Sequence, residues 1–128
     1  MKSTYMYIAL IVVLIVGLIF MRNHAGKTIA PENMTAIDTF NQCLGDAGAK
    51  MYGAYWCPHC QAQKKLLGNS KKIPYVECST PDQKGQTPIC IEKKIQGYPT
   101  WIFADGSIGD GEQTLEELSK KTSCALPS

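Results

Sequence analysis

The chain has 128 residues, which is enough for one small domain and a tail. Its 13 Lys and Arg residues against 11 Asp and Glu residues give a formal net charge of +2, and no basic face of the kind that binds nucleic acid is apparent. Six cysteines, an even number, favour an oxidising compartment, because disulfides persist there and are rare in a reducing cytosol.

The amino-terminal run of residues 5–21 carries no charge and is almost wholly aliphatic. As a helix it would extend roughly 26 Å, near the thickness of a hydrocarbon core. A cleaved signal peptide is the alternative, but its apolar core is usually only about 7–15 residues long and the sequence NHAG is a poor cleavage site. We therefore expect a transmembrane anchor over 5–21 behind a cytoplasmic stub of residues 1–4. The flanking charges do not define its orientation, whereas the cysteines place the remainder outside the cytoplasm.

The next residues, 22–33, are polar and contain Gly26 and Pro31, which predicts a linker. We expect a folded domain over 34–124 and a short tail over 125–128. Helical spacing of apolar residues, β-rich runs and turn residues alternate along this domain. They predict, in chain order, a helix over 33–46, a strand over 50–55, a helix from the cysteine motif to about 67, a strand over 74–78, a helix over 88–95, a strand over 99–105, a hairpin return over 107–111 and a helix over 114–121.

The order of these elements predicts an α/β fold. A strand–helix–strand unit flanked by helices implies a small mixed sheet that helices cover on both faces. Asp105 and Gly106 predict the turn of an antiparallel hairpin at the edge of that sheet. Thr114 and Glu117 have the spacing of a capping box for the last helix.

The motif AYWCPHC places two cysteines where a strand passes into a helix. A thiolate at the first turn of a helix lies near unpaired N–H groups and the positive end of the helix dipole. Cys60 lies three residues after Cys57, on the same helix face and within reach for a disulfide. We therefore predict that Cys57 is the nucleophile and that Cys60 resolves the mixed disulfide.

The two residues between the cysteines are predicted to tune the dithiol. Pro58 sets the start of the helix. His59 can carry a positive charge and donate hydrogen bonds near the Cys57 sulfur, which would stabilise the thiolate and make the disulfide a better oxidant. The alternative is an exposed histidine with no effect on the reaction.

The motif AYWCPHC, together with GYPTW about forty residues later, resembles the thioredoxin superfamily. Residues 34–124 as a whole are similar to the thioredoxin-like domains fused to, or working beside, bacterial vitamin K epoxide reductase homologues. The dipeptide Pro58-His59 resembles that of periplasmic disulfide oxidases such as DsbA.

This resemblance implies a thioredoxin-like fold and a redox-active disulfide without a further cofactor. Pro99 would be the cis-proline that faces the two cysteines, which agrees with the confinement of cis bonds to X–Pro. Tyr98 would pair through its backbone with an incoming peptide, and Trp56 and Thr100 would complete the substrate-binding residues. The chain departs from the family at Met51, where a buried acid usually helps to deprotonate the resolving thiol.

Loss of that acid leaves the proton acceptor open between water, His59 and Glu77. We expect Trp56, Tyr55 and Tyr52 to form an apolar rim around the dithiol. Trp101 and Phe103 are expected in the core of their strand.

The remaining four cysteines allow three pairings. Cys78 ends a strand and Cys90 begins the next helix, so a bridge between them would close the intervening polar loop, and the similar domains carry a comparable pair. A bridge from Cys43 to Cys124 would then tie together the two ends of the domain. A second redox pair at Cys78–Cys90 is the alternative to a structural bridge.

Three functions fit these residues to different degrees. The first is a membrane-anchored, extracytoplasmic thiol–disulfide oxidoreductase that oxidises the thiols of exported proteins and is re-oxidised by a quinone-linked membrane partner, such as a vitamin K epoxide reductase homologue. A reductase or isomerase that receives electrons from the membrane is the runner-up. The second is a thiol module in which Cys57, Cys60 and His59 take up copper(I) or four cysteines hold zinc. The chain lacks the second close cysteine pair of a zinc ribbon, so that no metal is expected. The third, a passive disulfide-bonded adhesion domain, leaves the paired motifs unexplained.

Overall fold

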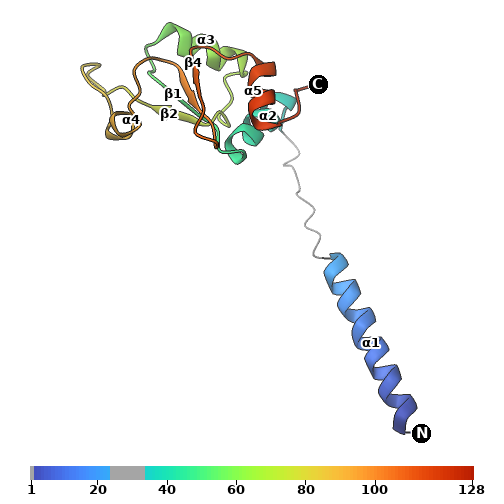
Figure 1. Ribbon diagram of the computed structural model, residues 1–128. Helices are drawn as coiled ribbons and strands as arrows, with labels where there is room; N and C mark the ends of the chain where they lie inside the picture. The colour runs from blue at the N-terminus through green and yellow to red at the C-terminus, as the bar shows by residue number, and fades with distance from the viewer. Residues whose placement is uncertain (1, 24–33) are drawn as a thin grey trace. The chain divides into compact units, whose positions relative to one another are not determined.

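The structure is a computed structural model that describes residues 2–23 and 34–128 (Figure 1). The chain divides into two compact units, Met1–Glu32 and Asn33–Ser128, and each is described by itself. Residues 24–33 of the predicted linker lie outside the described residues.

The first unit contains one helix, α1, over Lys2–Asn23. The described side chains of residues 5–8 and 10–16 are exposed. In the part of the chain that the structure describes, no helix combines the length and the apolar character needed to cross a membrane. Residues 5–21 form part of this helix, and the transmembrane anchor predicted over them stays a prediction.

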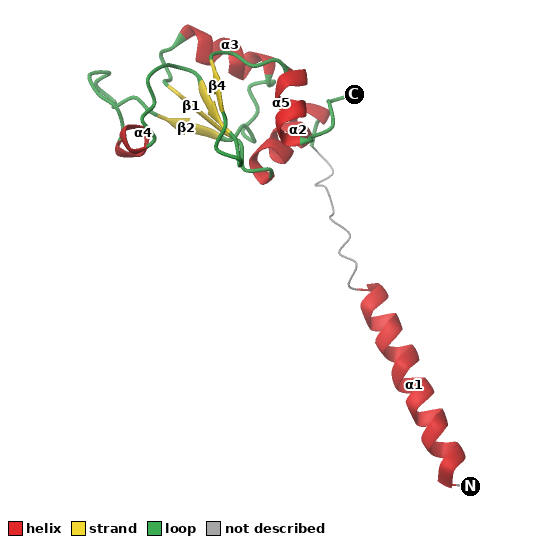
Figure 2. Ribbon diagram, viewed as in Figure 1, coloured by secondary structure: helices red, strands yellow, loops and turns green. Residues whose placement is uncertain are grey.

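The second unit is built on a four-stranded mixed sheet (Figure 2). Its strands lie in the order β2-β1-β3-β4. The parallel pair β1–β2 is joined by a helix, whereas β1–β3 and β3–β4 are antiparallel. The predicted hairpin is thus present, with β4 at the edge. The elements of this unit are α2 (Ala36–Asp46), β1 (Lys50–Gly53), α3 (Pro58–Leu66), β2 (Tyr75–Glu77), α4 (Pro88–Glu92), β3 (Thr100–Ile102), β4 (Ile108–Asp110) and α5 (Leu115–Thr122).

Neighbouring residues of the strands enter two separate cores, because side chains alternate between the faces of a sheet. Met51 and Trp101 join a cluster with residues of α2, α3 and α5. Tyr52, the next residue of β1, joins a second cluster with Cys90 of α4. The three helices α2, α3 and α5 therefore cover one face and α4 packs on the other, which confirms the mixed α/β architecture.

Most predicted elements form, and their ends differ for local reasons. Helix α2 begins at Ala36 because Thr35 and Asp38 make a capping box there. Helix α4 ends at Glu92, three residues before the predicted end, because Lys94 adopts a left-handed conformation with φ 55°. The predicted capping box of Thr114 and Glu117 is present at α5.

Two disulfides cross-link this unit at the predicted cysteines. Cys43 of α2 is joined to Cys124, which follows α5, and the bridge connects residues 81 positions apart. Cys78, which follows β2, is joined to Cys90 of α4. Cys78 and Cys90 are completely buried. Exchange begins at a sulfur with some exposure, such as Cys57 at 6%, and neither sulfur of this bridge has any, which favours a structural bridge over the alternative of a second redox pair.

Candidate active site

Cys57 occupies the N-cap of α3, directly before Pro58 at the first helical position. The Cys57 backbone N–H donates to the Ala54 carbonyl at 3.0 Å, so a tight turn ends the strand segment before the helix begins. Its side chain makes no capping hydrogen bond, which leaves the first N–H groups of α3 unpaired near the sulfur. A thiolate at this position is stabilised by those N–H groups and by the helix dipole.

Cys60 lies one turn further along α3 and is completely buried. Burial is the main cause that raises the pKa of the Cys60 thiol from an ordinary 9.0 to about 12. Hydrogen bonding and charge from Cys57 act in the same direction, whereas the Ala54 backbone and Lys64 act against it. Both cysteines are free thiols in the structure. The pair thus combines one sulfur at the helix end with one that is protonated and shielded from solvent.

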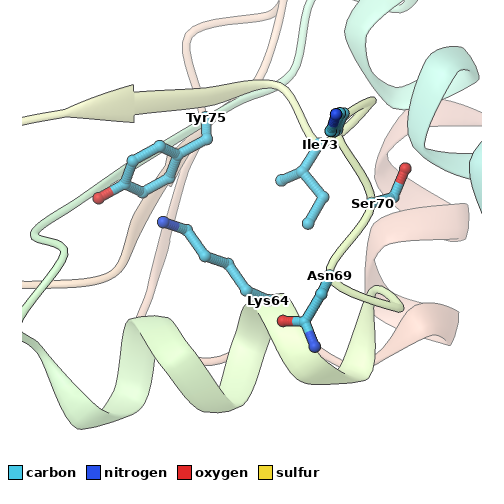
Figure 3. A pocket seen from close by; sticks show the side chains of 6 residues that line it. Lys64, Asn69, Ser70, Ile73 and Tyr75 are labelled. Carbon is cyan, nitrogen blue, oxygen red and sulfur yellow. The ribbon is translucent and has the colours of Figure 1, made fainter.

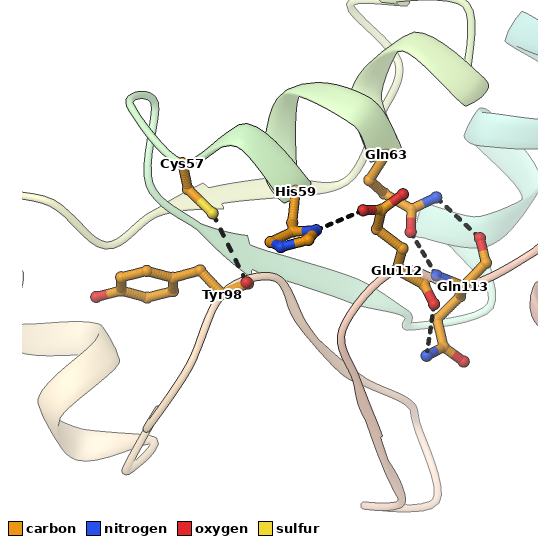
Figure 4. A network of polar contacts seen from close by, with 6 residues as sticks. All are labelled: Cys57, His59, Gln63, Tyr98, Glu112 and Gln113. Atoms are coloured by element: carbon orange, nitrogen blue, oxygen red, sulfur yellow. Dashed lines mark hydrogen bonds and ion pairs between the residues drawn. The ribbon is translucent and has the colours of Figure 1, made fainter.

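The Tyr98–Pro99 peptide bond is cis, as the resemblance implies. It brings the second motif, 41 residues away along the chain, against the first: the Cys57 thiol donates to the Tyr98 carbonyl at 3.7 Å. Figure 4 shows this contact on one side of the cysteine motif. The structure therefore places Cys57 next to the backbone that the resemblance assigns to an incoming peptide.

His59 lies between the cysteines, and its ring pairs with a carboxylate. Its Nδ1 atom lies 2.7 Å from Oε1 of Glu112, in the loop between β4 and α5 (Figure 4). The predicted hydrogen bond from His59 to the Cys57 sulfur is absent among the contacts of the described residues. The stabilisation of the Cys57 thiolate by His59 stays a prediction.

Glu112 is held beside His59 by a contact that the motifs did not reveal. Gln63 of α3 is completely buried, and its amide group forms two hydrogen bonds with the backbone of Gln113. Gln63 Nε2 donates to the Gln113 carbonyl at 3.0 Å, and the Gln113 N–H donates to Gln63 Oε1 at 2.6 Å. These two bonds fix the loop against the helix that carries the cysteines (Figure 4).

Two of the three predicted rim residues are exposed beside the dithiol. Trp56 is 43% exposed, contacts the Tyr98 ring edge-on at 6.1 Å and donates from Nε1 to Ser79 Oγ at 2.8 Å. Tyr55 is also exposed. Tyr52 is not a rim residue: it is buried in the second core, because it points to the opposite face of β1 from Met51.

Thr100 lies directly after Pro99, and its predicted role in substrate binding stays a prediction. The residue is buried, and its hydroxyl donates to the Gly97 carbonyl at 2.8 Å. It therefore stabilises the loop that carries Pro99. Trp101 and Phe103 are buried, as predicted for core residues.

Met51, at the usual position of the buried acid, is completely buried in the main core. The nearest carboxylate that the sequence offered as an alternative, Glu77, lies on the neighbouring strand and accepts a hydrogen bond from the Tyr75 hydroxyl at 2.8 Å. Tyr75 was not among the predicted site residues. Only its alternate-residue spacing from Glu77 on β2 offered a signal, because residues two apart share a face.

The residues that the structure describes contain no group of three or more His, Cys, Asp or Glu side chains placed to hold a metal ion. The alternative of zinc held by Cys57, Cys60, Cys78 and Cys90 is contradicted, because Cys78 and Cys90 are joined to each other in a disulfide. What the arrangement offers is a dithiol poised for disulfide exchange.

Comparison with known proteins supports the same chemistry. No protein-family model matches the chain. It is 43% identical over 88 residues to the thiol-disulfide oxidoreductase LTO1 of Arabidopsis thaliana, a match that covers 65% of this chain and 23% of that protein. It is 31% identical over 110 residues to the thioredoxin domain-containing protein 5 homolog of Drosophila melanogaster, covering 73% of this chain and 26% of that protein.

The chain thus spans about a quarter of the length of the curated relatives it matches. Their names, with the mixed sheet and its helices, support a relationship to the thioredoxin superfamily and an oxidoreductase activity.

Proposed function

We propose that this chain is a thiol–disulfide oxidoreductase that exchanges disulfides with exported proteins through Cys57 and Cys60. The observation that carries the proposal is the free dithiol at the start of α3, which faces the carbonyl before a cis-proline. The other four cysteines are paired, so the dithiol alone remains for exchange among the described residues.

Oxidation of client thiols is the proposed direction. A client thiolate attacks the Cys57 sulfur of the Cys57–Cys60 disulfide, and Cys60 leaves; a second client thiol then displaces Cys57, which releases an oxidised client and a reduced dithiol. The dipole of α3 stabilises the Cys57 thiolate, which favours the reduced form and makes the disulfide the stronger oxidant.

An extracytoplasmic compartment is part of the same proposal. Two disulfides that cross-link the domain persist in an oxidising environment, and exported proteins fold there. A quinone-linked membrane protein, such as a vitamin K epoxide reductase homologue, is the proposed partner that restores the Cys57–Cys60 disulfide. Support for this partner comes from the resemblance of residues 34–124 to the domains that work beside such homologues.

A redox titration of the full chain against glutathione tests the proposal. We expect reversible exchange at Cys57–Cys60 with a potential near −120 mV, in the range of strong oxidases, whereas a value near −270 mV would assign the reductase direction instead. The Cys60→Ser variant should accumulate mixed disulfides with client proteins at Cys57, and Cys57→Ser should form none. A dithiol that does not react with glutathione, in a folded protein, would contradict the function.

A further inference from the structure

Disulfide exchange requires that the buried Cys60 gain and lose a proton. Its sulfur is shielded from solvent, and no carboxylate is present at Met51 to exchange that proton. The charged and titratable groups that act on Cys60 are Cys57 and Lys64 of α3 and, from the neighbouring strand, Tyr75. Tyr75 on β2 is thus the titratable group from another element that acts on Cys60.

Gly53 allows the Tyr75 ring to approach the Cys60 sulfur. A Cβ atom on Gly53 would lie 2.7 Å from Cys60 Sγ and 3.0 Å from Tyr75 Cε2, the ring atom next to the carbon that bears the hydroxyl. The sulfur and the ring edge therefore both border the same backbone position of β1, and no hydrogen bond joins the Cys60 sulfur to the Tyr75 hydroxyl among the described residues. A side chain at 53 would crowd both.

The Tyr75 hydroxyl is connected in turn to a fixed carboxylate. It donates to Glu77 Oε2 at 2.8 Å, while Glu77 Oε1 accepts from the Ser79 N–H at 2.8 Å and from the Tyr55 N–H at 3.3 Å. Burial, followed by this bond to Glu77, raises the pKa of the Tyr75 hydroxyl well above its ordinary value of 10.0. Tyr75 therefore stays protonated and passes protons on without accumulating a charge.

Lys64 of α3 places its ammonium group over the Tyr75 ring. Its Nζ atom lies 3.4 Å from the centroid of the Tyr75 ring, and both residues line a pocket of about 250 Å³ (Figure 3). The ammonium group favours the thiolate form of Cys60, one helical turn before it. The pocket gives water access to the outer side of the ring, where a proton can enter or leave.

We propose that Tyr75 and Glu77 form the proton relay of Cys60, in place of the buried acid that this chain lacks at Met51. The inference rests on the proposed function. When Cys60 attacks a mixed disulfide at Cys57, the Cys60 sulfur and the Tyr75 oxygen close to hydrogen-bonding distance. The S–H proton passes to the Tyr75 oxygen, and the Tyr75 hydroxyl proton passes to the Glu77 carboxylate.

A Cys57–Cys60 bond forms as the bond from Cys57 to the client sulfur breaks, and the client leaves as a thiolate that takes a proton from solvent. The two cysteines are oxidised and the client disulfide is reduced. In the oxidising direction the same relay runs backwards, so that Glu77 and Tyr75 protonate Cys60 as it leaves the disulfide.

The test follows the two steps separately in the reduced full chain mixed with oxidised glutathione. Acid quenching and mass measurement resolve the Cys57–glutathione adduct from the Cys57–Cys60 disulfide. In Tyr75→Phe and Glu77→Gln we expect adduct formation at the unchanged rate and its resolution slowed about 100-fold at pH 7. The difference should shrink toward alkaline pH, because solvent base then removes the Cys60 proton directly.

Tyr52→Phe and Glu92→Gln are the matched controls, since Tyr52 is a buried tyrosine on the other face of β1 and Glu92 is an exposed carboxylate of α4. Both should resolve the adduct at the original rate. Relay variants that resolve the adduct as fast as the unmodified chain, or that slow it equally at every pH, would overturn the relay while leaving the proposed function intact. An unmodified chain that forms no adduct would overturn both.

Discussion

At the scale of single residues, the site depends on one close approach at Gly53. This glycine has no positive φ, so its requirement is space rather than backbone conformation. The Cys60 sulfur and the Tyr75 ring occupy the volume that a side chain would need. The residue thus links the packing of β1 to the chemistry of the dithiol.

We predict that Gly53→Ala destabilises the domain by about 1–3 kcal/mol, because the added methyl group overpacks a rigid backbone position. Gly97→Ala is the control, since nothing lies within 4 Å of a Cβ at that position. Urea unfolding of both variants measures the free energies. Equal stability of the two variants would show that the close approach at Gly53 is not a constraint.

The raised pKa of Cys60 predicts a loss of stability at high pH. The folded chain holds the thiol proton up to about 12, whereas the unfolded chain releases it near 9. Stability is therefore fully present below about pH 9 and is lost as the pH rises toward 12. Thermal unfolding of Cys57→Ser should show a midpoint that falls in this range relative to Cys57→Ser/Cys60→Ser, and parallel pH curves of the two variants would contradict the shift.

At the scale of elements, α3 is joined to the loop before α5 by the two hydrogen bonds of Gln63 with the Gln113 backbone. The contact sets the position of Glu112 and, through it, of the His59 ring. These hydrogen bonds therefore hold the loop before α5 against α3, the helix that carries the dithiol.

We predict that Gln63→Leu destabilises the domain by about 2 kcal/mol, because it leaves two backbone groups of Gln113 without partners. Gln42→Leu is the control: Gln42 bonds Asp46 on an exposed face of α2, and its loss should cost less than about 0.5 kcal/mol. Denaturant unfolding compares the two. A Gln63 variant as stable as the Gln42 variant would mean that the loop is held elsewhere.

At the scale of the whole domain, the two structural disulfides close loops of very different length. Cys43–Cys124 spans 81 positions and Cys78–Cys90 spans 12. A longer loop removes more conformational freedom from the unfolded chain when it is closed. The first bridge therefore stabilises the fold more than the second.

We predict a loss of about 4.5 kcal/mol for Cys43→Ala/Cys124→Ala and about 3 kcal/mol for Cys78→Ala/Cys90→Ala. The unfolding midpoint in urea, measured with the Cys57–Cys60 pair reduced in every protein, gives both values. A greater loss on removing the shorter loop would show that local packing of α4, rather than chain entropy, dominates.

The sequence by itself determined the order of the elements in the folded domain and the chemistry of the dithiol. Local signals suffice for these features: a cysteine before Pro58 at a helix start, the capping residues Thr114 and Glu117, and a proline that opens a strand. Each depends on residues a few positions apart, whose geometry the backbone fixes almost alone.

Only the tertiary structure decided which distant residues meet the cysteines. Sheet register and loop path decide on which face Tyr52 lies. They also decide the pairing of His59 with Glu112, 53 residues away, and the approach of both Cys60 and Tyr75 to Gly53. No periodicity along the chain encodes these contacts, because a shift of one residue in register turns every side chain of a strand to the opposite face.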